Sequence, residues 1–154
     1  MKAASPDISF IIPHLLMGSQ PTKEVYRRLE SDGVRLIINT RVFSDNGRRT
    51  SIPVENFRAI DAPFFPLPMN DLFMGAESAA KLIKNEQTVF VHCRYGRHRS
   101  ALMAASILIA LGYSSDEAIS MIKKARPESN PNIFYIKRRI KQFEAEWKKR
   151  HPTL

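Results

Sequence analysis

Short apolar runs separated by polar and turn-forming residues predict a set of β-strands. The runs have strand length and are rich in β-branched and aromatic residues, which is typical of buried strands. They lie at residues 8–18, where Pro13 breaks the run into a strand pair, and at residues 34–40, 57–60 and 88–92. Helical patterns separate most of these runs, and this alternation of strand and helix favours a mostly parallel sheet.

Apolar residues spaced three or four apart predict the helices. Val25 and Leu29 lie on one face of a helix expected at residues 21–33. Further helices are expected at residues 74–85, 100–112 and 114–125. The last of these opens with a capping box formed by Ser114 and Glu117. A final helix carries an apolar stripe made of Ile133, Ile136, Ile140, Phe143 and Trp147, and its basic residues are expected to face solvent.

The chain has 154 residues, which is the size of one ordinary domain. With 44% hydrophobic residues it has enough apolar material for one sizeable core. We therefore expect one compact α/β domain over residues 1–154, with a central, mostly parallel sheet flanked by helices. Residues 1–7 are expected to form a flexible N-terminal tail.

The charge balance bears on the partners of the protein. A net charge of +9 favours anionic partners, although zinc-finger spacing and RNA-binding aromatic motifs are absent from the sequence, which disfavours nucleic acid. The longest apolar stretch, at residues 101–112, is too short for a membrane span. The N-terminus makes a poor signal peptide, so we expect a cytoplasmic protein.

The only cysteine of the chain, Cys93, directly follows a predicted buried strand and precedes a predicted helix. The residues between them must form a tight loop, in which Gly96 is free to adopt a left-handed conformation. Backbone N–H groups of such a loop and the N-terminus of the helix point toward its centre and make an anion-binding nest. The same field favours a thiolate and lowers the thiol pKa below its free value of about 8.5. Arg99 offers a planar guanidinium to two oxygens of a phosphoryl group.

The string His-Cys-x5-Arg-Ser that begins at His92 resembles the signature of the cysteine-dependent protein tyrosine phosphatase superfamily. The segments LLMGSQPTKEVYRRLESDGVRLIINTR and GYSSDEAISMIKKARPESNPN are similar to its dual-specificity branch. The resemblance thus covers most of residues 10–147, and it is weakest at residues 43–73. It implies a phosphatase that uses neither a metal ion nor another cofactor.

The resemblance implies a role for each residue of the loop. Cys93 attacks phosphorus and carries a phosphocysteine intermediate. Ser100 stabilises the thiolate that leaves when the intermediate is hydrolysed, and His92 orders the loop and tunes the thiol. The phosphoryl oxygens are bound by the Arg99 guanidinium and by the backbone of the loop residues Arg94, Tyr95, Gly96, Arg97, His98 and Arg99.

The family also uses an aspartate that precedes the cysteine and protonates the leaving oxygen. Asp71 follows an extended Pro-rich stretch and precedes a predicted helix, which is the local context of the acid in many members. Asp61 lies further from Cys93, at a separation that is common in the family. Asp71 is the preferred candidate and Asp61 the alternative.

The expected substrate is a phosphorylated protein, with phosphotyrosine, phosphoserine and phosphothreonine admitted by a shallow cleft. The end of the loop, GRHRS, looks like the loop of phosphatases that act on inositol pyrophosphates. Phosphoinositides, inositol phosphates or pyrophosphates and RNA 5′-phosphates are therefore alternative substrates. Two hypotheses of another class are a non-catalytic phosphate-binding module and a rhodanese-like sulfurtransferase, which has no need of the arginine at position 99.

Overall fold

A computed structural model describes residues 7–43, 49–59 and 66–152, and in these residues it places a five-stranded sheet of order β1-β2-β5-β3-β4. The strands are β1 (Ile8–Ile12), β2 (Leu15–Gly18), β3 (Val34–Asn39), β4 (Val54–Asn56) and β5 (Thr88–His92). Strands β2, β5, β3 and β4 run parallel to one another, whereas β1 pairs antiparallel with β2. The predicted α/β fold with a mostly parallel sheet is therefore confirmed.

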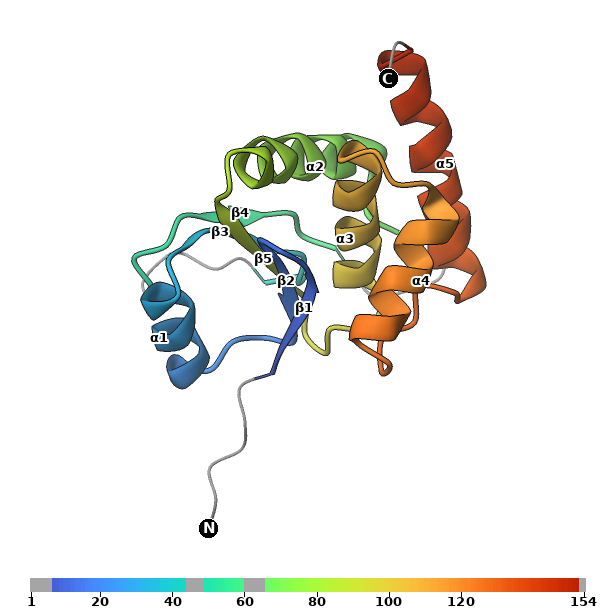
Figure 1. Cartoon of the computed structure of the whole chain (residues 1–154). Helices are drawn as coiled ribbons and strands as arrows, with labels where there is room; N and C mark the ends of the chain where they lie inside the picture. The colour runs from blue at the N-terminus through green and yellow to red at the C-terminus, as the bar shows by residue number, and fades with distance from the viewer. Residues whose placement is uncertain (1–6, 44–48, 60–65, 153–154) are drawn as a thin grey trace.

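Helices cover both faces of this sheet (Figure 1). They are α1 (Lys23–Ser31), α2 (Met69–Lys84), α3 (Arg99–Ala110), α4 (Ser115–Ala125) and α5 (Phe134–Arg150). Val89 and Val91 of β5 belong to the core shared with α2 and α3, whereas Phe90 belongs to the core shared with α1. Successive side chains of a strand point to opposite faces, so this strand, apolar from Val89 to Val91, is buried on both sides.

The carboxyl ends of three parallel strands meet at one edge of the sheet. Gly18 at the end of β2 and Asn39 at the end of β3 both lie in register with His92 at the end of β5. The segments that follow these strands therefore gather at the same edge. Open α/β sheets bind their ligands at such an edge.

Two elements differ from the prediction. The strand expected at residues 57–60 lies earlier, as β4. Phe57 follows β4, donates its N–H to the Asn39 carbonyl at 2.8 Å and buries its ring in the core. The end of the expected range lies outside the described residues. Helix α2 begins at Met69, several residues earlier than expected, because the Pro68 carbonyl already accepts a hydrogen bond from the Leu72 N–H.

The N-terminal segment is anchored at its last residue. Asp7, which was expected in a flexible tail, pairs with Arg126 through contacts of 2.6 and 2.9 Å. The rest of the expected tail, residues 1–6, lies outside the described residues. Asp7 is therefore held by an ion pair with Arg126 and does not belong to a flexible segment.

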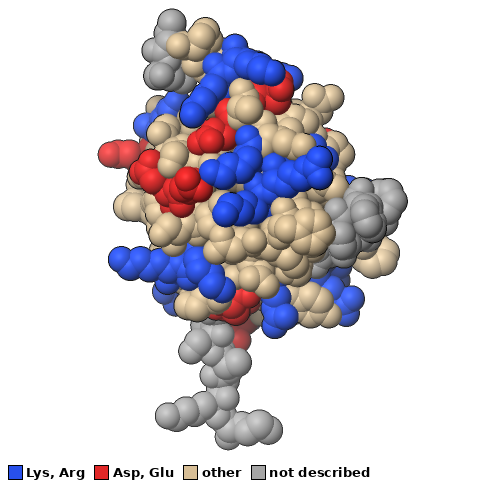
Figure 2. All heavy atoms as spheres, turned by 90° about the vertical axis from the view of Figure 1, so that its right-hand side faces the viewer, with Lys and Arg blue, Asp and Glu red and all other residues tan. Residues whose placement is uncertain are grey.

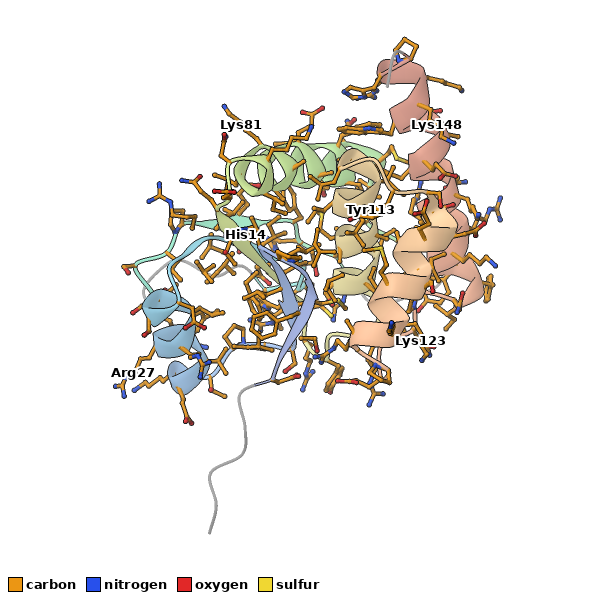
Figure 3. All side chains as sticks on the ribbon, viewed as in Figure 1. His14, Arg27, Lys81, Tyr113, Lys123 and Lys148 are labelled. Carbon is orange, nitrogen blue, oxygen red and sulfur yellow. The ribbon has the colours of Figure 1, made fainter. Side chains whose placement is uncertain are left out.

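The face over α4 and α5 gathers many lysines and arginines among a smaller number of acidic side chains (Figure 2). Three of its lysines form the ion pairs Lys141–Asp116, Lys148–Glu144 and Lys149–Glu146. Lys148 of α5, like Lys81 of α2 and Arg27 of α1, extends away from its helix and is exposed (Figure 3). This is the pattern of solvated helix faces. Within the described residues, the helices lack the combination of length and apolar character that crossing a membrane requires.

Candidate active site

Cys93 starts the loop that joins β5 to α3, and its side chain is only 2% exposed. Its sulfur accepts a hydrogen bond from the Gly96 N–H at 3.1 Å and lies 3.2 Å from the Ser100 hydroxyl. Gly96 has a φ of 68°, and a Cβ there would lie 2.6 Å from the Arg126 guanidinium. Only glycine fits this position without strain.

Four successive carbonyl groups of the loop are bound from its outside. The Arg94 carbonyl accepts the Gln20 N–H, and the Arg97 carbonyl accepts the Asn130 N–H. The Tyr95 and Gly96 carbonyls both accept from the Arg126 guanidinium. All four distances lie between 2.8 and 3.2 Å. The C=O and N–H of a trans peptide plane point in opposite directions. The N–H groups that follow these carbonyls therefore face the inside of the loop, which is the geometry of an anion-binding nest.

Several effects act on the Cys93 thiol. Burial alone raises the pKa of Cys93, because it disfavours the charged form. The Ser100 hydroxyl, backbone N–H groups of Ser100 and Arg97, and the charge of Arg99 lower the pKa of Cys93 and outweigh burial. The pKa of Cys93 therefore lies below its ordinary value, which favours the thiolate, the nucleophilic form of the side chain.

Arg99 begins α3 and is 7% exposed. One terminal nitrogen of its guanidinium donates to the Ala59 carbonyl at 2.9 Å. Its buried Nε has no acceptor among the described residues. A buried charged donor without an acceptor is unfavourable, so this side of the guanidinium is suited to an incoming anion.

A pocket of about 480 Å³ opens beside the loop, and its lining includes Arg99. The other lining residues are Gln20, Arg41, Val42, Phe43, Arg94 and Tyr95. Phe43 and Tyr95 are 67% and 56% exposed, and each ring has an arginine beside it, with Arg41 6.0 Å from Phe43 and Arg94 5.2 Å from Tyr95. The pocket therefore combines a basic lining with two aromatic side chains.

Asn39 holds the backbone of two residues of the pocket lining, Arg41 and Phe43. Arg41 and Phe43 follow β3 and are not among the candidate site residues that the sequence indicates. The buried Asn39 amide donates to the Phe43 carbonyl at 2.9 Å, and its oxygen accepts the Arg41 N–H at 3.0 Å. A buried asparagine at the end of a parallel strand was the available signal, since buried amides order the backbone around them.

The remaining predicted loop residues lie around the sulfur or on the surface. His92 is fully buried, its Nδ1 lies 3.4 Å from the Cys93 carbonyl, and its ring stacks on Phe90. Arg97 is exposed, whereas His98 packs edge-on against Tyr135 of α5 at 6.1 Å.

The two candidate acids are placed differently. Asp71 lies inside the first turn of α2, not on a loop before the helix. Asp71 is not among the residues that line the pocket beside the loop. Asp61 lies outside the described residues.

A cysteine with a lowered pKa lies in a nest of N–H groups with a buried arginine beside it, an arrangement that suits the binding of an anion such as phosphate. The family described as "Dual specificity phosphatase, catalytic domain" matches residues 15–146. This chain belongs to that family, and so to the cysteine-dependent protein tyrosine phosphatase superfamily.

The names of similar proteins agree with this family assignment. Mouse "Dual specificity protein phosphatase 8" is 30% identical over 144 residues, covering 86% of this chain and 20% of the relative. This chain thus spans about a fifth of that protein. Rat "Phosphatidylglycerophosphatase and protein-tyrosine phosphatase 1" is 34% identical over 122 residues, covering 73% of this chain and 63% of the relative. The crystal structure of PTPMT1 in complex with PI(5)P superposes with a TM-score of 0.81 at 28% identity, covering 94% of this chain and 98% of that one.

Proposed function

We propose that this chain hydrolyses phosphomonoesters through a phosphocysteine intermediate without a metal ion. The observation that carries the proposal is the convergence of a low-pKa thiol, inward N–H groups and a buried arginine beside one pocket. Oxygens of a phosphoryl group placed there are matched by fixed dipoles and a guanidinium. Such preorganised donors are what phosphoryl transfer requires.

The proposed reaction has two steps. In the first, the Cys93 sulfur bonds to phosphorus while the bond from phosphorus to the leaving oxygen breaks, and an aspartic acid protonates that oxygen. In the second, water attacks phosphorus, its proton passes to the same carboxylate, and the P–S bond breaks to give inorganic phosphate and the thiolate. The Ser100 hydroxyl, 3.2 Å from the sulfur, stabilises that thiolate as it leaves. His92 orders the start of the loop.

Two aspartates compete for the role of the acid. Burial raises the pKa of Asp71, which favours the protonated form that an acid needs. The observation in favour of Asp61 is that the Ala59 carbonyl, two residues earlier in the chain, accepts a hydrogen bond from Arg99. The corresponding asparagine variants separate the two assignments.

For the substrate we favour phosphorylated proteins, with phosphotyrosine accepted together with phosphoserine and phosphothreonine. Phe43 and Tyr95 place two aromatic side chains on the pocket lining, where either could form a wall beside the substrate ring. Their exposed rings offer flat apolar surface to the phenyl ring of phosphotyrosine.

A second candidate substrate is a phosphoinositide or an inositol phosphate. Arg41 and Arg94 add two guanidinium groups to the pocket that Arg99 lines. Guanidinium groups bind phosphate in a bidentate manner, so they suit a substrate with a second phosphate group. The names of the PTPMT1 relatives, and the PI(5)P bound in one of their structures, support testing this class.

The test is a phosphate-release assay with EDTA present. Its substrates are phosphotyrosine, phosphoserine and phosphothreonine peptides, phosphoinositides in vesicles, soluble inositol phosphates and 5′-phosphorylated RNA. We expect the greatest turnover with the phosphotyrosine peptide, and none by Cys93→Ser. Stable binding without phosphate release would indicate a binding module, and thiocyanate formed from thiosulfate and cyanide would indicate a sulfurtransferase. Either result overturns the proposal.

A further inference from the structure

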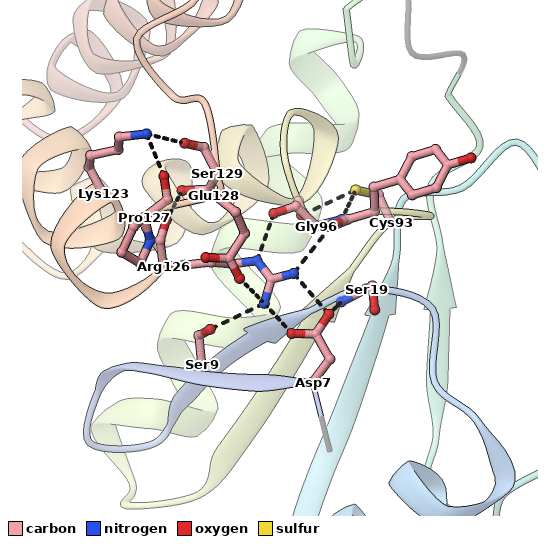
Figure 4. Close-up of polar contacts among 12 residues, drawn as sticks. Asp7, Ser9, Ser19, Cys93, Gly96, Lys123, Arg126, Pro127, Glu128 and Ser129 are labelled. Atoms are coloured by element: carbon pink, nitrogen blue, oxygen red, sulfur yellow. Dashed lines mark hydrogen bonds and ion pairs between the residues drawn. The ribbon is translucent and has the colours of Figure 1, made fainter. Parts of the chain in front are cut away.

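Arg126, the residue after α4, is a buried cation outside the catalytic loop, and its side chain is 2% exposed. All five N–H groups of its guanidinium have acceptors (Figure 4). These are the Gly96 carbonyl at 2.8 Å, the Tyr95 carbonyl at 3.2 Å, Asp7 Oδ1 at 2.6 Å, Asp7 Oδ2 at 2.9 Å and Ser9 Oγ at 3.2 Å. Because every donor is used, the orientation of the guanidinium is fixed.

Two of these bonds act on the peptide planes that face the sulfur. The Tyr95 carbonyl belongs to the same peptide plane as the Gly96 N–H, which donates to the Cys93 sulfur at 3.1 Å. The Gly96 carbonyl belongs to the plane of the Arg97 N–H, which lowers the pKa of Cys93. Since each trans plane holds its C=O and N–H in opposite directions, holding both carbonyls aims both N–H groups at the sulfur.

Asp7 in turn fixes Arg126. Its two oxygens form a bidentate pair with the guanidinium, and one of them also accepts the Ser19 N–H at 3.2 Å. The hydrogen bond from Arg126 holds the pKa of Asp7 at about 2, so Asp7 is ionised at neutral pH. The other carboxylate near Arg126 is Glu128, at 3.5 Å and 50% exposed.

We propose that Asp7 and Arg126 form a positioning pair, in which a carboxylate from the N-terminal segment orients the guanidinium that keeps the catalytic loop in its anion-binding conformation. This rests on the proposed function of the loop. Neither residue touches the sulfur through a described hydrogen bond. Both act through the backbone of Tyr95 and Gly96, and the charge of Arg126 also interacts with Cys93 through space.

The pair depends on charge as well as shape. Asp7→Asn keeps the size of the side chain but replaces one acceptor oxygen with an N–H donor that faces the guanidinium. A buried arginine that loses its carboxylate partner is no longer held in its original orientation. Arg126 then shifts toward other acceptors or solvent, and the two loop carbonyls lose their fixed donor.

The test uses the fact that Cys93 is the only cysteine in the chain, so alkylation by iodoacetamide reports on this thiol alone. The alkylation rate is measured against pH for the wild type, Asp7→Asn and Asp7→Glu, with and without inorganic phosphate as a protecting anion. Two controls are Asp32→Asn, which breaks the exposed Arg28–Asp32 pair, and Glu128→Gln.

We expect Asp7→Asn to shift the midpoint of the alkylation profile upward and to weaken protection by phosphate about tenfold, less than the loss of a whole oxyanion donor. Asp7→Glu, which keeps the carboxylate, should lie between Asp7→Asn and the wild type. Both controls should stay within about twofold of the wild type, the range expected of exposed ion pairs.

The proposal is overturned if the profile and the phosphate protection of Asp7→Asn match those of the wild type. If circular dichroism shows that Asp7→Asn is unfolded, the test relies on Asp7→Glu. An alkylation profile of Asp7→Glu that matches the wild type then overturns the proposal in the same way. Alkylation needs no turnover, so a wild type that releases no phosphate refutes the proposed function and still leaves this test valid.

Discussion

Replacing Ser100 with alanine tests the electrostatics of the sulfur directly. The Ser100 hydroxyl lies 3.2 Å from the Cys93 sulfur, and both side chains are buried. A hydrogen bond to a charged group contributes about 1.5–3 kcal/mol, and because sulfur is a weak acceptor we take the lower end. About 1.4 kcal/mol corresponds to a tenfold change, so Ser100→Ala should lower the ratio of thiolate to thiol about tenfold.

Ser100→Ala should affect the two chemical steps unequally. The first step uses the thiolate as nucleophile, whereas the second expels it as leaving group and needs its stabilisation at the moment the P–S bond breaks. With p-nitrophenyl phosphate, we expect a rapid burst of nitrophenol followed by slow steady turnover. Such a burst is the kinetic sign of an accumulated covalent intermediate.

The assays are iodoacetamide alkylation against pH and rapid-mixing kinetics. The matched control is Ser106→Ala, because Ser106 is equally buried in α3 but its hydroxyl donates to the Leu102 carbonyl at 2.9 Å. Below the midpoint of its profile, Ser100→Ala should be alkylated about tenfold more slowly, given the energy above. If its alkylation profile coincides with that of Ser106→Ala, the hydroxyl does not stabilise the thiolate and the reasoning is refuted.

Three further predictions concern other parts of the chain. The asparagine variant of the true acid, Asp71 or Asp61, should lower kcat on a poor leaving group about 10²–10⁴-fold and flatten the basic limb of the pH profile; equal effects of both variants would contradict a single acid. Phe43→Ala should raise KM for a phosphotyrosine peptide about fivefold, equivalent to about 1 kcal/mol of ring packing, and leave KM for a phosphoserine peptide unchanged. An equal rise of KM for both peptides would show that Phe43 does not pack against the phosphotyrosine ring. The pKa of Asp7 falls from 3.8 to about 2, so its pairing with Arg126 stabilises the fold above about pH 4 and this contribution is lost as pH falls toward 2. Discounted for the exposure of Asp7, this contribution amounts to about 1 kcal/mol. The free energies of unfolding in urea of the wild type and Asp7→Asn should differ by this amount at pH 6 and converge only below pH 2.

Local pattern was enough to predict the sheet and the loop. The apolar run of β5, the single cysteine after it and Gly96 are neighbours in sequence, so one short stretch defines the strand, the turn and the start of α3. The capping box of Ser114 and Glu117 is likewise local, and the structure contains both of its hydrogen bonds.

What the pattern could not predict depends on contacts between distant segments. Arg126 stands in the sequence only as one residue of the segment GYSSDEAISMIKKARPESNPN, because the carboxylate that pairs with it lies 119 positions away in the chain. The side chains of Arg41 and Phe43 reach the pocket because Asn39 bends the backbone after β3. Periodicity reports which face of an element is buried, but it does not report which loops meet at the end of a sheet.

The close approach of the N-terminal segment to the loop relies on glycine at two positions. A Cβ on Gly18 would collide with the Asp7 carbonyl, and one on Gly96 would lie 2.7 Å from the Gly18 carbonyl. Segments from β2, the catalytic loop and the region before β1 are therefore packed backbone against backbone, with little space for an independent shift of any of them. A change that moves Asp7 is then transmitted to the N–H groups around Cys93 through rigid peptide planes rather than through flexible side chains. This explains why the reactivity of the sulfur should respond to a charge that makes no contact with it.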